Sequence, residues 1–415
     1  MKKLIILFLI FFSFTQNIFS QNDISKNDLK KELELIEGDL MKARIRVDKF
    51  CTNPSSSSKA SSWYLKGYVY TEISKSEVFS SQVSQPAKTA LEAIKKAKEL
   101  DKQKLFYSEI INVFFDLTPL LYNKAINNYN NGIQTKDKSQ AKNYFEKAAY
   151  YFELFFDAYN SLGVDKSFID SKYKIKTDKA YYYYAYSLYK ANKFEKAAEI
   201  FGKIVNPTNP ISIEREKSNP LAYNYYSEYL EKQGKVEEAI DIMIKANEIW
   251  PENKEIAINT IALLNKYKKT DELIKFTNKL EKNINDLKLL TVIAQSYRSI
   301  AKSFFDNGYI NSANEYTEKS AEYYKKALEK ANSNDNKFKI LYNIGVTYFN
   351  QGVKLYKNNY EEREKFQSAF KKSIDYLEQA KNLNPNNKKV LNMLMKAYQM
   401  TDQSEKAEEI SKLLY

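Results

Sequence analysis

The chain has 415 residues, with 65 Lys and Arg against 52 Asp and Glu, a formal net charge of +13, and no His. This length exceeds what one compact core normally holds and suits an extended array. The lack of His excludes Ser-His-Asp and Cys-His catalytic arrangements and His-ligated metals. A single cysteine, Cys51, can form neither a thiolate zinc site nor an intrachain disulfide.

The rest of the composition also argues against catalysis. Only nine Gly are present, and no Gly-rich phosphate-binding motif occurs. Paired carboxylates could serve a glycosidase, but Glu237–Glu238 and Glu361–Glu362 lie in Lys-rich segments, where a solvated face is expected. We therefore expect no enzyme activity, no cofactor and no metal.

The basic excess bears on the choice of partner. The simplest explanation is a solvated Lys-rich surface, and the excess would also suit an anionic partner, such as an acidic protein, a lipid headgroup or a polysaccharide. No nucleic-acid recognition motif is present, so nucleic acid is not expected.

Residues 1–20 have the pattern of a secretory signal peptide. Lys2 and Lys3 precede an apolar run of eleven residues, 4–14, and Ser20 is a small residue before the expected cleavage site. The run is shorter than the roughly 20 residues that span a bilayer. We expect an exported protein, periplasmic or secreted, without a transmembrane span after cleavage. The alternative is an uncleaved N-terminal anchor.

Residues 21–58 are expected to form a capping helix followed by a Ser-rich loop. The predicted helix covers residues 26–50, and a terminal cap would cover an otherwise exposed apolar face. Its apolar stripe is predicted to run through Leu29, Leu33, Ile36, Leu40 and Ile45.

Residues 59–205 and 221–415 are predicted to form successive helix pairs, separated by a Pro-rich connector at 206–220. In 180–206, Tyr181, Tyr184 and Leu188 fall on one helical stripe, and a second stripe follows a break at residues 191–193. The next unit repeats this arrangement, with Gly234 in its turn and Pro251 ending its second helix.

These segments resemble the tetratricopeptide repeat (TPR), which has large and small residues at fixed positions of two helices. A mostly small residue opens the second-helix stripe at Ala90, Ala141, Ala197, Ala239, Leu273, Ser320, Ser373 and Ala407. The resemblance implies an all-α superhelix of about seven to eight degenerate helix pairs, some with elongated helices. Together with the export signal, it looks like proteins common in Bacteroidota.

The resemblance also implies where a partner would bind. The first helix of each pair usually lines the concave face of such an array. By register, the partner-binding residues would be Tyr182, Tyr183, Tyr186, Tyr189, Lys190, Asn224, Tyr225, Glu228, Asn259, Asn265, Tyr342, Asn343 and Phe349. Tyrosines offer a large contact area with a hydrogen-bonding tip. However, Tyr occurs 34 times, which codon bias would also produce.

Two functions fit this pattern. The first is a non-catalytic scaffold that mediates protein–protein interactions in the cell envelope or outside the cell, with a protein or peptide in the groove. The alternative is a helical carbohydrate-binding protein of a nutrient-uptake system. Family members that dock chaperone tails use a Lys and Asn clamp, whose first-helix positions here are Tyr182 and Tyr186, so that mode is not expected.

Overall fold

The structure is a computed structural model that describes residues 34, 39–163, 166–205, 219–280, 285–358 and 361–414, without the side chain of Asp178. Over these ranges the chain forms α-helices joined by short connectors, and no strand is found in them. The predicted signal peptide and residues 206–218 of the predicted connector lie outside the described residues, as does most of 21–38.

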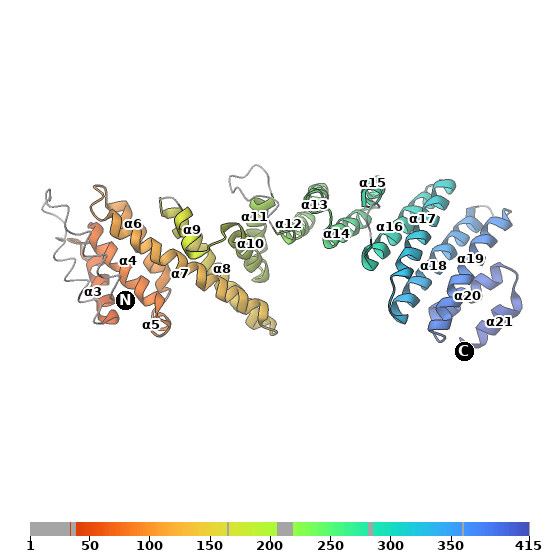
Figure 1. The fold of residues 1–415 in the computed structure, drawn as a ribbon, viewed down its shortest axis with the longest axis horizontal. Coiled ribbons are helices and arrows are strands. Elements are labelled where there is room, and N and C mark those ends of the chain that lie inside the picture. The colour runs from red at the N-terminus through yellow and green to blue at the C-terminus, as the bar shows by residue number, and fades with distance from the viewer. Residues whose placement is uncertain are drawn as a thin grey trace. The chain divides into compact units, whose positions relative to one another are not determined.

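The chain divides into two compact units, residues 1–219 and 220–415. Unit 1 contains α3 Leu40–Thr52, α4 Ala60–Lys75, α5 Glu77–Gln82, α6 Pro86–Leu100, α7 Tyr107–Gln134, α8 Lys138–Ser161, α9 Ser167–Tyr173, α10 Thr177–Lys190 and α11 Phe194–Val205. Its antiparallel pairs are α4 with α6, α7 with α8, and α10 with α11 (Figure 1).

Unit 2 contains α12 Leu221–Lys232, α13 Val236–Ile249, α14 Lys254–Lys266, α15 Thr270–Leu280, α16 Leu287–Asp306, α17 Ile310–Glu329, α18 Asn334–Asn358, α19 Arg363–Leu383, α20 Lys388–Met400 and α21 Ser404–Lys412. Consecutive helices pair from α12–α13 to α20–α21 (Figure 1). With the three pairs of unit 1, the described residues form eight helix pairs. The longest helix, α7, has 28 residues, so the predicted all-α array with some elongated helices is confirmed.

Short polar residues and turns set the helix boundaries. The side chains of Asp137, Asn253, Asp286 and Asn387 accept hydrogen bonds from backbone N–H groups in the first turns of α8, α14, α16 and α20. The predicted break at 191–193 separates α10 from α11. Gly234 lies in the predicted turn between α12 and α13, and its φ of 76° falls in the left-handed region that favours glycine.

Small residues sit where the two helices of a pair approach most closely. A Cβ on Gly67 of α4 would lie 3.1 Å from the Ile94 Cβ of α6. A Cβ on Gly345 of α18 would lie 2.6 Å from Leu377 of α19. Gly67 and Gly345, small residues of the predicted large-small pattern, therefore lie at contacts between the two helices of a pair.

Serine hydroxyls add a hydrogen bond between the two helices of three pairs. Ser320 of α17 donates to the Ala294 carbonyl of α16 at 2.8 Å, and Ser373 of α19 donates to the Gly345 carbonyl of α18 at 2.8 Å. In the pair α12–α13 the direction is reversed: Ser227 of the first helix donates to the Ala239 carbonyl of the second at 3.0 Å. A buried hydroxyl is satisfied in each case without widening the contact.

Tyrosines on the first helices connect each pair to the helix before it. The hydroxyl of each donates to a side chain of the preceding helix at 2.8 to 3.3 Å: Tyr70 to Asp48, Tyr297 to Asn278, Tyr348 to Glu318, and Tyr398 to Glu378. Part of the high tyrosine content thus has a structural use between neighbouring helices.

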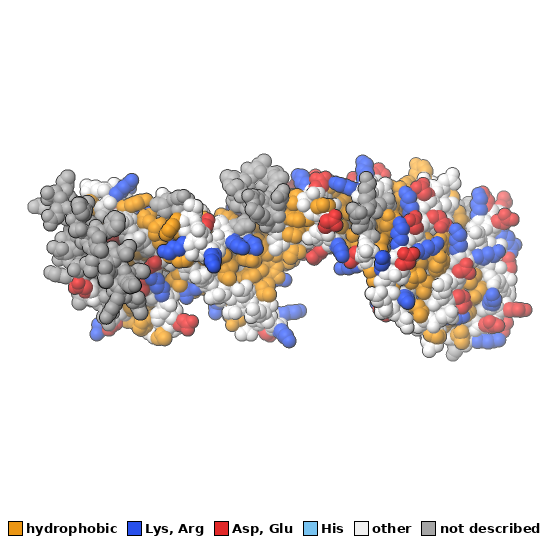
Figure 2. All heavy atoms as spheres, viewed as in Figure 1, with side chains coloured by type: hydrophobic (Ala, Val, Ile, Leu, Met, Phe, Trp, Pro, Cys, Tyr) orange, Lys and Arg blue, Asp and Glu red, His pale blue; other side chains and the backbone are white. Residues whose placement is uncertain are grey.

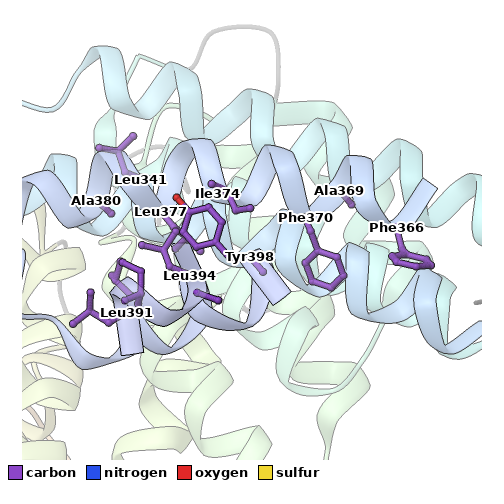
Figure 3. Close-up of a cluster of buried hydrophobic side chains, with 14 of the residues drawn as sticks. Leu341, Phe366, Ala369, Phe370, Ile374, Leu377, Ala380, Leu391, Leu394 and Tyr398 are labelled. Carbon is purple, nitrogen blue, oxygen red and sulfur yellow. The ribbon is translucent and has the colours of Figure 1, made fainter. Parts of the chain in front are cut away.

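The C-terminal pairs enclose a continuous apolar core. Phe370 and Leu377 of α19 are almost fully buried, and Leu391 and Leu394 of α20 pack against them. Figure 3 shows Leu377 beside Leu394 and Tyr398. The aromatic ring of Phe370 also fills the space opposite Gly352, whose Cβ would come within 2.9 Å of it.

Two details of the predicted pattern are wrong. Ile45 is 52% exposed, because α3 begins at Leu40 behind the N-cap Asp39 and buries the stripe Ala43, Val47 and Cys51 instead. Ala141 is only half-buried, because it lies in the first turn of α8, near the tip of the long α7–α8 hairpin. Ala148, two turns further along, is fully buried in its place.

Candidate binding surfaces on the first helices

The predicted tyrosines of unit 1 lie on α10 and differ in exposure. Tyr182 is only 6% exposed and packs against Phe201 of α11, so it offers a partner little surface. Tyr183, Tyr186 and Tyr189 are half-buried and Lys190 is exposed.

A tyrosine of α7 completes this surface. The ring of Tyr129 lies 4.6 Å from Tyr183 and 5.8 Å from Tyr186, measured between centroids. Lys190 Nζ lies 5.2 Å from the centroid of the Tyr186 ring. Burial raises the pKa of Tyr129, with smaller contributions from Tyr186 and Tyr183, so the Tyr129 hydroxyl stays protonated near neutral pH. Sequence reasoning missed Tyr129, although Tyr122 and Tyr129 recur at a helical interval of seven.

The predicted residues at the start of unit 2 lie on α12 and α14. Asn224, Tyr225 and Glu228 of α12 are half-buried, and Glu228 pairs with Lys232 of the same helix at 2.7 Å. Asn259 and Asn265 of α14 are also half-buried. Of these five residues, only Asn265 lines one of the hollows described below.

The three predicted residues of α18 are half-buried and already make contacts within unit 2. Tyr342 stacks on Phe338 of its own helix, and Phe349 packs edge-on against Phe370 of α19. Asn343 accepts a hydrogen bond at 3.1 Å from Arg298 of α16. This bond links two successive first helices.

Two adjoining hollows flank α16. One, of about 390 Å³, is lined by residues of α14, α15, α16 and the turns that follow α14 and α16, including Asn265, Lys268 and Asp306. The other, of about 260 Å³, lies among α16, α17 and α18 and includes Arg298, Thr347 and Lys354. Ser299 and Lys302 line both hollows, so the two adjoin along one face of α16.

Sequence reasoning missed the α16 residues of these hollows. The prediction placed a second helix at Ser320 but named no first helix before it and assigned no inward residues to 287–306. A signal was present, because Leu290, Ile293, Ala294 and Tyr297 repeat the first-helix pattern of large, large-small and large residues. Arg298 and Ser299 follow that pattern directly.

The hollows contain one carboxylate, Asp306. Lys302 donates to it at 2.6 Å, and Lys354 also pairs with it. These hydrogen bonds, first from Lys302 and then from Lys354, lower the pKa of Asp306. A carboxylate held ionised in this way cannot donate a proton near neutral pH.

The surface around these helices mixes both signs of charge. Figure 2 shows Lys and Arg side chains interspersed with Asp and Glu over the helices of unit 2. Among the described residues, no helix has the length and apolar character needed to cross a membrane.

No family model matches the chain, and no curated protein matches it. Among solved structures, the chain is similar to the MamA protein, at 15% identity and a TM-score of 0.32 over 49% of this chain and 91% of that one. It is also similar to YrrB, described as a TPR protein with an unusual peptide-binding site, at 17% identity and 0.33 over 55% and 97%.

A third similar structure is the C-terminal part of a TPR repeat-containing protein from Cytophaga hutchinsonii, at 16% identity and a TM-score of 0.39 over 65% of this chain and 93% of that one. Scores of this size add nothing to what the helix pairs show by themselves. With their small residues at the close approaches and their tyrosine links to the preceding helix, the pairs make this chain an all-α array of tetratricopeptide-like repeats.

Proposed function

We propose that this chain is a non-catalytic scaffold that binds a segment of a partner protein along the first helices of unit 2. The two hollows along α16 carry the proposal. They are lined by side chains of three successive first helices, α14, α16 and α18. A surface shared by several repeats suits an extended segment better than a compact small molecule.

The chemistry of the hollows supports binding and not catalysis. Asp306 is their one carboxylate and is neutralised by two lysines, so the pair of carboxylates that a glycosidase needs is not found in them. The remaining polar groups are hydroxyls, amides and cations. Such groups orient a ligand without transforming it.

Export of the scaffold is part of the proposal and rests on the N-terminal pattern. The positive residues, the short apolar run and Ser20 support cleavage before Gln21. Mass spectrometry of the protein from its native host should then find Gln21 as the first residue. An intact N-terminus in the cytosolic fraction would contradict export while leaving the binding proposal intact.

A peptide-display selection on the purified full chain tests the binding proposal. Ser299 is exposed and lines both hollows, so Ser299→Trp should fill them without changing the charge. Asn311→Trp places the same ring on an exposed, neutral position of the second helix α17 as a matched control. We expect peptides selected on the wild type to lose binding to Ser299→Trp and to keep it with Asn311→Trp.

Two results would count against the scaffold. One is a selection that yields no binding peptide. The other is peptide binding that Ser299→Trp leaves unchanged. If a glycan array instead yielded ligands that Ser299→Trp abolished, carbohydrate binding would replace peptide binding as the function.

A further inference from the structure

The charges that line the two hollows are strongly unbalanced. Five cations lie there: Lys268 and Lys269 in the α14–α15 turn, Arg298 and Lys302 on α16, and Lys354 on α18. Asp306 is the one lining carboxylate. The rest of unit 2 mixes both signs, so this excess is local.

The carboxylates present leave part of the charge uncompensated. Lys302 and Lys354 share Asp306, and Lys269 pairs with Glu237 of α13. Five cations against these two carboxylates leave an excess of three positive charges. Among the described residues, neither Arg298 nor Lys268 has a carboxylate partner.

Arg298 is held in place by a neutral group. It is half-buried, and its Nη1 donates to the Asn343 amide oxygen of α18 at 3.1 Å. A guanidinium has five N–H donors in a fixed plane, and it pairs with a carboxylate through two of them. The bond to Asn343 therefore orients the group while other donors remain for a ligand.

The other hollow is lined by a side-chain amide whose orientation is fixed. Asn265 donates through Nδ2 to the Ile261 carbonyl at 3.1 Å and to Ser296 Oγ at 3.2 Å. Ser296 donates its own proton to the Val292 carbonyl, so it can only accept from Asn265, and this fixes the orientation of the amide. Asn265 Oδ1 is then buried without a donor and out of reach of a ligand, so Asn265 forms a fixed part of the wall of this hollow.

The geometry points to an acidic peptide segment of a partner protein as the occupant of the two hollows. Its side-chain carboxylates pair with Arg298 and with the excess charge of Lys302 and Lys354. This inference rests on the proposed scaffold function and specifies the chemistry of its ligand.

A protein segment fits these groups better than single-stranded nucleic acid. Proteins that bind single strands stack bases on exposed aromatic rings. The one aromatic residue that lines the hollows, Phe305, is 6% exposed.

The display selection with random linear peptides tests this inference on three full-length proteins: the wild type, Arg298→Gln and Arg363→Gln. Arg363 is 62% exposed at its side chain and lies at the start of α19, so its replacement makes the same charge change away from the hollows. We expect wild-type peptides to be enriched in Asp and Glu over the starting library. The best peptide should bind Arg298→Gln roughly tenfold or more weakly, and Arg363→Gln nearly as tightly as the wild type.

A synthetic copy of that peptide with Gln in place of each Glu, and Asn in place of each Asp, should bind the wild-type protein more weakly by a similar factor. Circular dichroism melts show whether each variant is folded. Selected peptides without acidic enrichment, or equal binding to Arg298→Gln, would overturn the inference while the scaffold function stood. Tighter, Arg298-dependent binding of oligoadenylate RNA would overturn it in favour of nucleic acid. A failed selection would remove the scaffold function itself.

Discussion

The tyrosine hydroxyls that connect neighbouring helices are expected to contribute measurably to stability. Tyr348 is buried and donates to Glu318, which also accepts from Lys372 of α19, so three successive helices meet at one carboxylate. A buried hydrogen bond to a charged acceptor is worth about 1.5–3 kcal/mol. Because Lys372 remains after the change, we expect Tyr348→Phe to lower the free energy of unfolding by about 1–2 kcal/mol near pH 8. Urea denaturation measures this, and Tyr309→Phe on an exposed ring should change nothing.

The same hydroxyl should make stability depend on alkaline pH. Burial, and then the hydrogen bond to Glu318, raise the pKa of Tyr348 above its usual value near 10. Below pH 10 both states keep the proton and the stabilisation is fully present. Above pH 10 the unfolded chain loses the proton first, so the free energy of unfolding falls. The difference between wild type and Tyr348→Phe should therefore shrink above pH 10, and a constant difference would contradict this.

At the residue scale, the sequence predicts which small residues lie at contacts between helices, but it does not predict the groups to which they form hydrogen bonds. It identified Ser320 and Ser373 as small positions, yet the carbonyl that each hydroxyl meets depends on the register of the partner helix. It also could not separate Tyr182 from Tyr183, because in a run of four tyrosines only the packing of α8 and α11 sets which ring is buried.

At the scale of single helices, the N-caps are testable. Asn387 Oδ1 accepts from the N–H groups of Lys389 and Val390 at 3.1 and 3.2 Å, which satisfies two donors at the start of α20. We expect Asn387→Ala to lower the free energy of unfolding by about 1 kcal/mol. Asn392→Ala, at an exposed position in the middle of the same helix, should have no cost or stabilise slightly. Equal effects of the two changes in chemical denaturation would argue against the cap.

Helix existence and pairing could be predicted from apolar spacing and from the turns at 191–193 and Gly234. The phase of α3 could not, because its buried stripe depends on the contact with α4 and on where Asp39 starts the helix. The α16 surface was missed for a related reason. Its repeat was counted through Ser320 of the second helix, but the irregular repeat before it, with Leu273 where a small residue is expected, left the register of the first helix unassigned.

At the scale of the whole molecule, the two units should be separable. The apolar cluster from Phe305 to Ile410 lies entirely within residues 220–415. We expect residues 220–415, expressed alone, to be helical and to melt cooperatively, because stacked repeats are stabilised by their neighbours. Circular dichroism measures both, and a largely unfolded fragment would show that residues 1–219 are needed for its stability.

A crystal structure of the full chain with a display-selected peptide tests the central claim most directly. The account predicts peptide density along α16, with a side-chain carboxylate at hydrogen-bonding distance from the Arg298 guanidinium. Density on the second-helix side, or against the tyrosines of α10 with the α16 hollows empty, would contradict it.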